Sequence, residues 1–382
     1  MEPAQTVNEV YYLKQIIELK DEIIKLQKEL LEKDKIIEKD KEIIRDLQNK
    51  LNIENNGKNI ISINSSTPNI STPNPITPSG SLNISEKEII FKMEDLQAAY
   101  YTIYILQDER LASGGNSTSI IIYNNQTFKS EMTIKEYSNY IMHLTQLKNG
   151  NLVSLWADAY INIYSLLDNY KYIVLQKIKN HTSRIHKLRE FDNNKFMTCS
   201  DDNTITFFFK DKNEYKEDYT LQEDIKINDI LRTKEKEIVY SGFNNSFFIS
   251  FYDLKSRKKI DSTKVTNFYA GLSDFLYMMC QKYLLVGTNS SIIIFDVNQH
   301  RQIREIQNNI SNCITSFLKI DETTLLSVDC GGKINQWIID DDDLIFENTK
   351  EKAHNGQIRM IRKNQEGLII TCSDDNSIKV WA

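Results

Sequence analysis

The stretch that decides the fold is Ile-Thr-Cys-Ser-Asp-Asp-Asn-Ser-Ile-Lys-Val-Trp at residues 370–381, because it occurs twice. Residues 197–208 read Met-Thr-Cys-Ser-Asp-Asp-Asn-Thr-Ile-Thr-Phe-Phe, and ten of the twelve positions are identical or close substitutions. A shared pattern of this length within one chain indicates an internal repeat. The last aromatic residue of each copy, Trp381 or Phe208, serves as a marker for further copies.

Marker aromatics recur at spacings of 41, 44, 44, 43, 42 and 44 residues. They are Tyr123, Tyr164, Phe208, Tyr252, Phe295, Trp337 and Trp381. Each repeat reads as four short strands: an apolar strand, a strand ending in small residues before a polar turn, an alternating strand ending at the marker, and a polar-edged strand. The sequence therefore predicts an all-β fold over residues 86–382, a propeller of seven four-stranded blades.

With these repeats, residues 86–382 resemble the WD-repeat family. In that family a blade joins a histidine before its first strand, a Ser or Thr, an Asp and a Trp in one hydrogen-bonded network. The resemblance implies such a network in the seventh repeat from His354, Ser373, Asp375 and Trp381. In the third repeat it implies a shorter one from His181, Ser200 and Asp202, because Phe208 has no indole N–H. The other five repeats lack the histidine, so we expect packing to hold them.

A spare strand pattern at residues 86–93 precedes the first repeat. The seventh repeat ends right after its third strand, at Ala382, and so lacks an outer strand. We expect residues 86–93 to complete this last blade, because doing so removes an exposed sheet edge.

Upstream of the propeller lies a tract of Asn, Ser, Thr and Pro at residues 53–85, which holds four of the five prolines. Its low hydrophobicity predicts a flexible, disordered linker. Thr67, Thr72 and Thr77 each precede a proline, which makes them candidate sites for a proline-directed kinase. A plain low-complexity linker is the alternative.

Apolar residues repeat in heptads over residues 10–52, which contain no Gly or Pro, and residues 1–9 are predicted to be disordered. The pattern predicts a long α-helical coiled coil. Its seam consists of Ile16, Leu19, Ile23, Leu26, Leu30, Ile37, Ile44, Leu47 and Leu51. Ile at a with Leu at d favours a parallel homodimer, and further apolar positions leave a trimer open. The alternatives are a helix packed on its own propeller and a charged helix that does not oligomerise.

Composition narrows the function classes. The chain is 40% hydrophobic and 26% charged with a net charge of −6, which argues against nucleic acid as a partner. It has neither a membrane-spanning apolar run nor a signal-peptide pattern, so we expect a cytoplasmic protein without membrane insertion. Five cysteines without a C-x-x-C pair predict reduced, buried thiols rather than disulfides or zinc ligands. We expect no metal and no cofactor.

Candidate binding residues are those that precede the first strands of the blades, where propellers place their loops. Tyr140, Arg184, Lys226 and Gln357 form a polar, partly cationic arc in this set. Such an arc suits an acidic or phosphorylated peptide, and the alternative is an ordinary mixed surface.

The sequence therefore predicts a non-enzymatic scaffold or adaptor that binds proteins or peptides on one propeller face and is oligomerised by its coiled coil. One alternative is the substrate-recognition subunit of a ubiquitin ligase whose other subunits are separate chains. A third reading, an enzyme supported by the propeller, lacks a catalytic set, because the repeat itself explains the neighbouring His, Ser and Asp residues.

Overall fold

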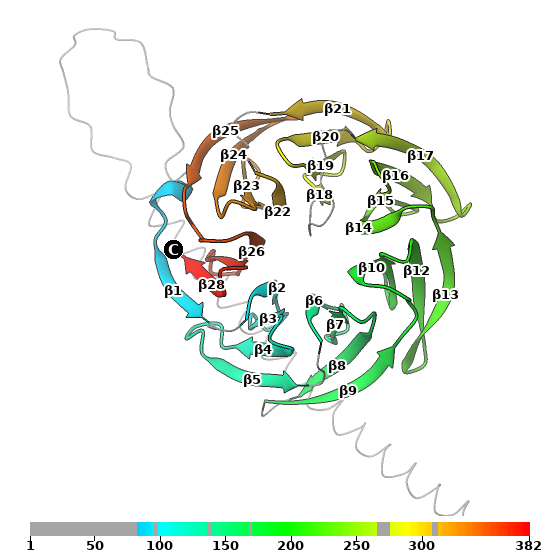
Figure 1. Cartoon of the computed structure of the whole chain (residues 1–382), viewed down its shortest axis with the longest axis horizontal. Helices are drawn as coiled ribbons and strands as arrows, with labels where there is room; N and C mark the ends of the chain where they lie inside the picture. Colours follow the sequence, from blue (N-terminus) through cyan, green and yellow to red (C-terminus); the bar gives the residue numbers. More distant parts are fainter. Residues whose placement is uncertain (1–81, 95–97, 136–138, 168–169, 266–275, 308–311) are drawn as a thin grey trace, which may run out of the picture. The chain divides into compact units, whose positions relative to one another are not determined.

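The computed structural model of the chain describes residues 82–94, 98–135, 139–167, 170–265, 276–307 and 312–382. The predicted N-terminal tail, the coiled coil with its whole seam, and the linker up to residue 81 with Thr67, Thr72 and Thr77 lie outside the described residues. Apart from one short 3-10 helix, η1 (Ile84–Glu86), the regular structure of the described residues is β-strand. These strands form seven four-stranded sheets arranged as blades around a central axis (Figure 1).

The strands of each blade run antiparallel from the axis outward. The innermost strands are β2 (Tyr100–Ile105), β6 (Ile141–Gln146), β10 (Ile185–Asp192), β14 (Lys226–Lys234), β18 (Leu276–Met278), β22 (Ile314–Lys319) and β26 (Ile358–Lys363). The second strands are β3 (Leu111–Gly115), β7 (Leu152–Trp156), β11 (Lys195–Ser200), β15 (Glu237–Phe243), β19 (Tyr283–Gly287), β23 (Thr324–Asp329) and β27 (Ile369–Ser373).

The remaining strands form the outer half of each blade. The third strands are β4 (Ser119–Tyr123), β8 (Ile161–Leu167), β12 (Thr204–Asp211), β16 (Phe247–Asp253), β20 (Ile292–Asp296), β24 (Ile334–Asp340) and β28 (Ser377–Trp381). The outermost strands are β5 (Ser130–Lys135), β9 (Lys171–Ile178), β13 (Glu214–Gln222), β17 (Lys258–Val265), β21 (Arg301–Ile306), β25 (Asp343–Lys350) and β1 (Ile89–Glu94).

All seven marker aromatics lie on third strands and are buried, from 0% exposed for Trp337 to 5% for Tyr123. In every blade the pairing of the third and outermost strands shifts register at the marker, as at Phe208 and Trp337. Such a bulge bends the outer strand and increases its twist. The structure thus confirms the predicted seven-bladed propeller, with the markers at equivalent positions of the seven third strands.

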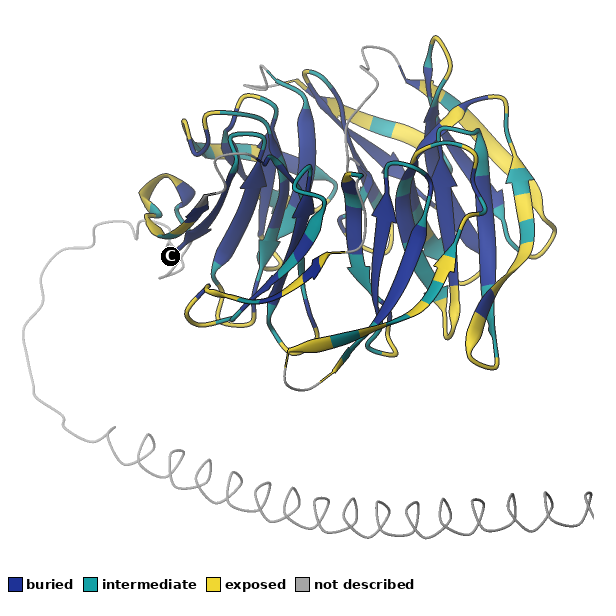
Figure 2. Ribbon diagram, turned by 60° about the horizontal axis from the view of Figure 1, so that its bottom comes forward, coloured by how far each residue is buried: buried dark blue, intermediate teal, exposed yellow. Residues whose placement is uncertain are grey.

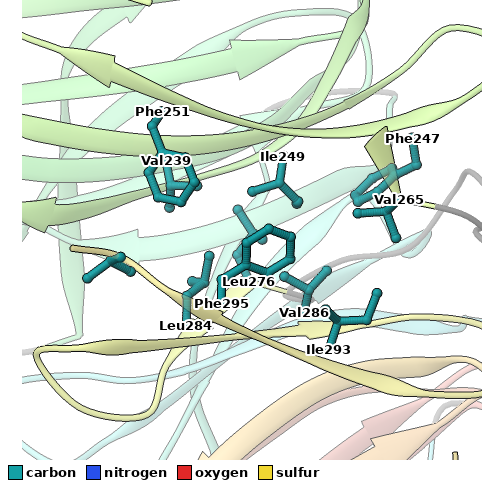
Figure 3. Close-up of a cluster of buried hydrophobic side chains, with 11 residues drawn as sticks. Val239, Phe247, Ile249, Phe251, Val265, Leu276, Leu284, Val286, Ile293 and Phe295 are labelled. Atoms are coloured by element: carbon teal, nitrogen blue, oxygen red, sulfur yellow. The ribbon is translucent and has the colours of Figure 1, made fainter. Parts of the chain in front are cut away.

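The core consists of apolar clusters, many of them between neighbouring blades. Figure 2 shows buried residues along the inner strands and exposed residues along the outer ones. The cluster between blades 4 and 5 brings β15, β16 and β17 against β18, β19 and β20 (Figure 3). It contains Val239, Phe247, Ile249, Phe251, Val265, Leu276, Leu284, Val286, Ile293, Phe295 and Val297. Packing between blades replaces the single central core of a sandwich, because the axis itself is lined by strand edges.

β1 closes the ring. It pairs antiparallel with β28, with Ile89 opposite Trp381 and Glu94 opposite Ser377. The backbones of Glu88 and Ala382 exchange hydrogen bonds of 3.3 and 3.1 Å just before this ladder. The outer strand of blade 7 therefore comes from the N-terminal side of the propeller, which leaves no unpaired edge on β28.

η1 docks on the outside of blade 6. Ile84 is 0% exposed, and its N–H donates to Oε1 of Gln336 at 2.8 Å. Nδ2 of Asn348 donates to Oδ1 of Asn83 at 3.0 Å, and Nζ of Lys350 donates to the carbonyl of Ser85 at 2.8 Å. Residues 82–85, the last four of the predicted linker, are thus held on β24 and β25, where Ile84 is buried and Leu82 is partly buried.

One cysteine expectation is wrong. Cys313 and Cys330 form a disulfide, with their Cα atoms 5.6 Å apart, and Cys280 is exposed. Cys199 and Cys372 are buried free thiols, as expected. Cys313 precedes β22 and Cys330 follows β23, so the antiparallel hairpin places them opposite one another although they are 17 residues apart. Spacing rules for local cysteine motifs do not detect such a cross-strand pair.

Candidate functional site

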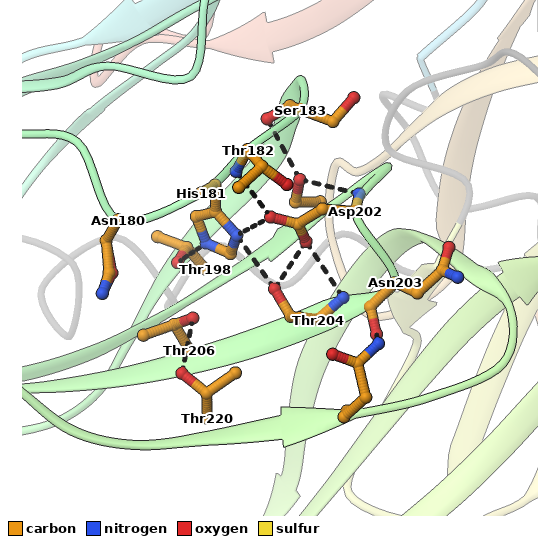
Figure 4. Close-up of polar contacts among 12 residues, drawn as sticks. Asn180, His181, Thr182, Ser183, Thr198, Asp202, Asn203, Thr204, Thr206 and Thr220 are labelled. Atoms are coloured by element: carbon orange, nitrogen blue, oxygen red, sulfur yellow. Dashed lines mark hydrogen bonds and ion pairs between the residues drawn. The ribbon is translucent and has the colours of Figure 1, made fainter.

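The histidine of blade 3 lies inside the blade. His181 is 2% exposed, and its Nδ1 is 3.0 Å from Oδ2 of Asp202 (Figure 4). Its Nε2 is 2.7 Å from Oγ1 of Thr198. Ser200, which the resemblance placed in this network, donates instead to the carbonyl of Ser183 at 3.1 Å and accepts from the N–H of Asp202. Thr198 therefore takes the place at the ring that the sequence analysis gave to Ser200.

Blade 7 repeats this arrangement with one additional bond. Nδ1 of His354 is 2.9 Å from Oδ2 of Asp375, and its Nε2 is 2.7 Å from Oγ1 of Thr371. Nε1 of Trp381 also donates to Oγ1 of Thr371, at 2.9 Å. Ser373 accepts from the N–H of Asp375 at 3.1 Å, as Ser200 does in blade 3. Thr371 thus links the histidine to the marker aromatic.

The electrostatics of these networks are those of a structural site. Burial alone would raise the pKa of the Asp202 and Asp375 carboxyls, but hydrogen bonds from the histidine and a neighbouring hydroxyl lower the pKa well below the usual range. Burial lowers the pKa of His354. Both ring nitrogens of each histidine are already engaged inside the blade, so these residues fix the turn before the third strand rather than meet a ligand.

The four predicted binding residues lie at the starts of innermost strands, on the face of the propeller that we call the channel face. The carbonyls of Tyr140, Arg184 and Gln357 accept hydrogen bonds of 2.9 to 3.0 Å from the residues that follow β7, β11 and β27. Lys226 begins β14 and pairs with Phe243 at the end of β15. The repeat thus places all four at equivalent positions of blades 2, 3, 7 and 4.

Two of the four lie in one cavity. Arg184 and Lys226 line a cavity of about 440 Å³ between blades 3 and 4. Tyr140, 49% exposed, and Gln357 do not line it. Within the predicted arc, this cavity therefore groups the cationic pair without the other two residues.

The sequence analysis missed two polar pairs on the channel face. Nε2 of His186 is 2.9 Å from Oδ1 of Asp201, and Arg359 donates to both carboxylate oxygens of Asp374 at 2.8 and 2.7 Å. The register shifts at both His186 and Arg359, the second residues of β10 and β26, and such a bulge redirects the side chain. The Asp-Asp pair common to both copies was the available signal. The second Asp of each pair, Asp202 or Asp375, binds the blade histidine. The first, Asp201 or Asp374, binds the residue in the bulge, His186 or Arg359.

Aromatic rings continue this face toward blade 2. The guanidinium of Arg359 lies 5.3 Å from the ring centre of Tyr101, and Tyr101 meets the ring of Tyr140 edge to face at 6.4 Å. Burial raises the pKa of Tyr101. Tyrosine and arginine are the residues on which binding energy concentrates at protein interfaces. The exposed ring of Tyr140 thus packs on Tyr101, which in turn contacts Arg359.

Comparison with known proteins bears on the family. Residues 347–382, which include β26, β27 and β28, match a protein-family model described as WD domain, G-beta repeat. No curated protein matches the chain. Within the described part of the chain, no cluster of three or more metal-ligating side chains occurs, and no helix there has the length and apolar character to cross a membrane.

Proposed function

We propose that the chain is a non-enzymatic scaffold or adaptor, from the premise that its described residues form a seven-bladed propeller whose last blade matches the WD domain, G-beta repeat model. WD-repeat propellers generally bind proteins or peptides. The proposal assigns partner binding to the channel face, through Tyr140, Arg184, Lys226 and Gln357. The observation that carries it is the pair of exposed cations, Arg184 and Lys226, which share a cavity and form no ion pair or side-chain hydrogen bond within the described residues.

Oligomerisation is the second part of the proposal. Its support is the heptad pattern of residues 10–52 and the linker that follows. A parallel homodimer, or a trimer, presents identical channel faces on one assembly. Linked faces raise the apparent affinity for a multivalent partner through effective concentration, without any new contact. The proposal places such an assembly in the cytoplasm.

The test is an affinity pull-down from native cell extract with the full chain. We compare the wild type with a variant that alters the channel face at all four positions, namely Tyr140→Ser, Arg184→Glu, Lys226→Glu and Gln357→Glu. A second variant, Ile23→Asp with Leu30→Asp, breaks the predicted seam. We expect the first to lose the partners and the second to retain less of them. Partners that ignore the channel-face variant and follow the seam variant contradict the assignment of the binding face.

A further inference from the structure

The cavity between blades 3 and 4 is built by equivalent elements of two neighbouring repeats. The start of β10 contributes Arg184 and His186, and the start of β14 contributes Lys226 and Asn228. Asp201, which follows β11, and Asp224 add two carboxylates. With about 440 Å³ of space, the cavity accommodates a side chain and its adjoining backbone.

The charges in the cavity are not equally available. Asp201 is engaged by His186 at 2.9 Å, and this hydrogen bond, with Lys226 and Arg184 nearby, lowers its pKa against the effect of burial. Asp201 is therefore ionised at neutral pH and already bound by His186. Arg184 and Lys226 are exposed and have no such partner in the described residues. Guanidinium and ammonium donors that face open space bind an incoming anion.

Asn228 supplies a second, independent observation. Among the lining residues it alone is buried, at 5% exposure. The register of β14 shifts between Ile227 and Asp229, so Asn228 occupies the bulge. Its Oδ1 has no hydrogen-bond partner within the described chain. A buried acceptor without a donor costs free energy, which a ligand N–H recovers.

The charge balance selects the kind of anion. Arg184 and Lys226 contribute two positive charges, while Asp201 and Asp224 contribute two negative ones within the same cavity. A carboxylate adds one negative charge, whereas a phosphate adds up to about two. Because the four fixed charges cancel, no surplus cation balances an added negative charge, so the two charges of a phosphate are repelled by the fixed carboxylates more than the single charge of a carboxylate is.

We infer that this cavity binds an unmodified Asp or Glu of a partner peptide in preference to a phosphorylated residue. The carboxylate lies between Arg184 and Lys226, and the backbone N–H beside it donates to the amide of Asn228. The inference rests on the proposed function and deepens it, because it names the recognised residue.

The experiment uses the full chain and a peptide array whose members share degenerate flanks and differ at one central residue. That residue is Asp, Glu, Asn, Gln or phosphoserine. We expect Asp and Glu to bind about tenfold more tightly than the others, since a charge-assisted contact is worth roughly that factor. Arg184→Gln with Lys226→Gln removes this preference. Asn228→Ala weakens all members and keeps their ranking.

The matched control is Lys255→Gln with Lys258→Gln, which removes the same charge from exposed residues at the other end of blade 4, in the turn after β16 and at the start of β17. It keeps the preference for Asp and Glu. Both surface doubles should melt like the wild type.

Phosphoserine as the strongest member overturns the inference, and so does a ranking unaffected by Arg184→Gln with Lys226→Gln, or an array without binding. If any of these occurs while the pull-down still depends on the channel face, only the inference fails. If the pull-down also ignores that face, the proposed function fails with it.

Discussion

Blades 7 and 5 differ in the interactions made at one equivalent position of their second strands. In blade 7 the marker aromatic Trp381 pairs with Ile369 on β27. Thr371, two residues further along β27, forms hydrogen bonds with both His354 and Trp381. The equivalent residue of blade 5 is Val286, which belongs to the apolar cluster shared with blade 4. At this position blade 7 has a polar network within itself, whereas blade 5 packs against its neighbour.

The remaining blades show that Val286 is the exception. A hydroxyl stands at this position in the other six blades, in Ser113, Ser154, Thr198, Tyr240, Ser327 and Thr371. In blades 2 and 6 it accepts from an indole, Trp156 at 2.7 Å and Trp337 at 2.9 Å. The five repeats without a blade histidine are thus less uniform than expected, because a partial network persists in some of them.

The largest expected effect is the loss of the marker aromatic in blade 5. Phe295→Ala should lower the free energy of unfolding by about 3–5 kcal/mol, because it opens a cavity in a buried apolar cluster. Urea unfolding measures this. Phe295→Leu is the control and should cost about 1.5 kcal/mol or less. Equal losses for the two variants contradict a packing-held blade.

Acid should weaken the two networks together. An unfolded histidine protonates near pH 6.5 and an unfolded aspartate near pH 3.9, whereas folding lowers the pKa of His354, Asp202 and Asp375. The folded protein thus binds fewer protons, so its stability falls as pH drops below about 6.5 and falls further below about 4. Thermal melting across this range measures the loss.

The control for the acid effect is Asp375→Asn, which leaves position 375 uncharged at every pH. Its stability should decline less steeply below about pH 4 than that of the wild type. An unchanged slope would show that Asp375 does not contribute to the acid sensitivity.

Removing one carboxylate tests a single network. Asp375→Ala should cost roughly 2–3 kcal/mol, since the buried ring of His354 loses a hydrogen bond to a charged group. Asp202→Ala should cost about the same, because the contacts of Asp202 are nearly identical. Chemical denaturation compares the two. A negligible loss for either would mean that packing, not the network, holds that blade.

The smallest expected effect comes from exchanging a hydroxyl for an apolar side chain, or the reverse, at this second-strand position. Thr371→Val removes two hydrogen bonds and Thr198→Val removes one, so the first should cost about 1 kcal/mol more. Val286→Thr should also destabilise, because its hydroxyl enters an apolar cluster. Differential scanning calorimetry ranks the three variants. A stabilising Val286→Thr would remove the distinction between the blades.

The sequence was sufficient for the blades because each has one buried aromatic at an equivalent position of its third strand, so spacing alone located seven of them. It was insufficient for partners that depend on strand pairing. Thr198 and Ser200 are two residues apart on β11 and therefore face the same side, so alternation does not choose between them. The choice depends on where along the strand His181 lies, which the sequence does not give. Cys313 and Cys330 were missed for the same reason.

The candidate site was predictable in part. Arg184 and Lys226 were found because the repeat marks the starts of innermost strands. Asn228 and His186 were not, because they occupy bulges, and a bulge adds a residue that alternation does not anticipate. The burial of Ile84 was hidden by the polar composition around it.

The order of η1 and β1 along the chain has a mechanical consequence. Force applied to the chain upstream of residue 82 reaches Ile84, docked on blade 6, before it reaches the ladder between β1 and β28. The load on that ladder therefore rises only after η1 detaches. Blade 6 thus shields the closure of the ring from tension that enters from the N-terminal side.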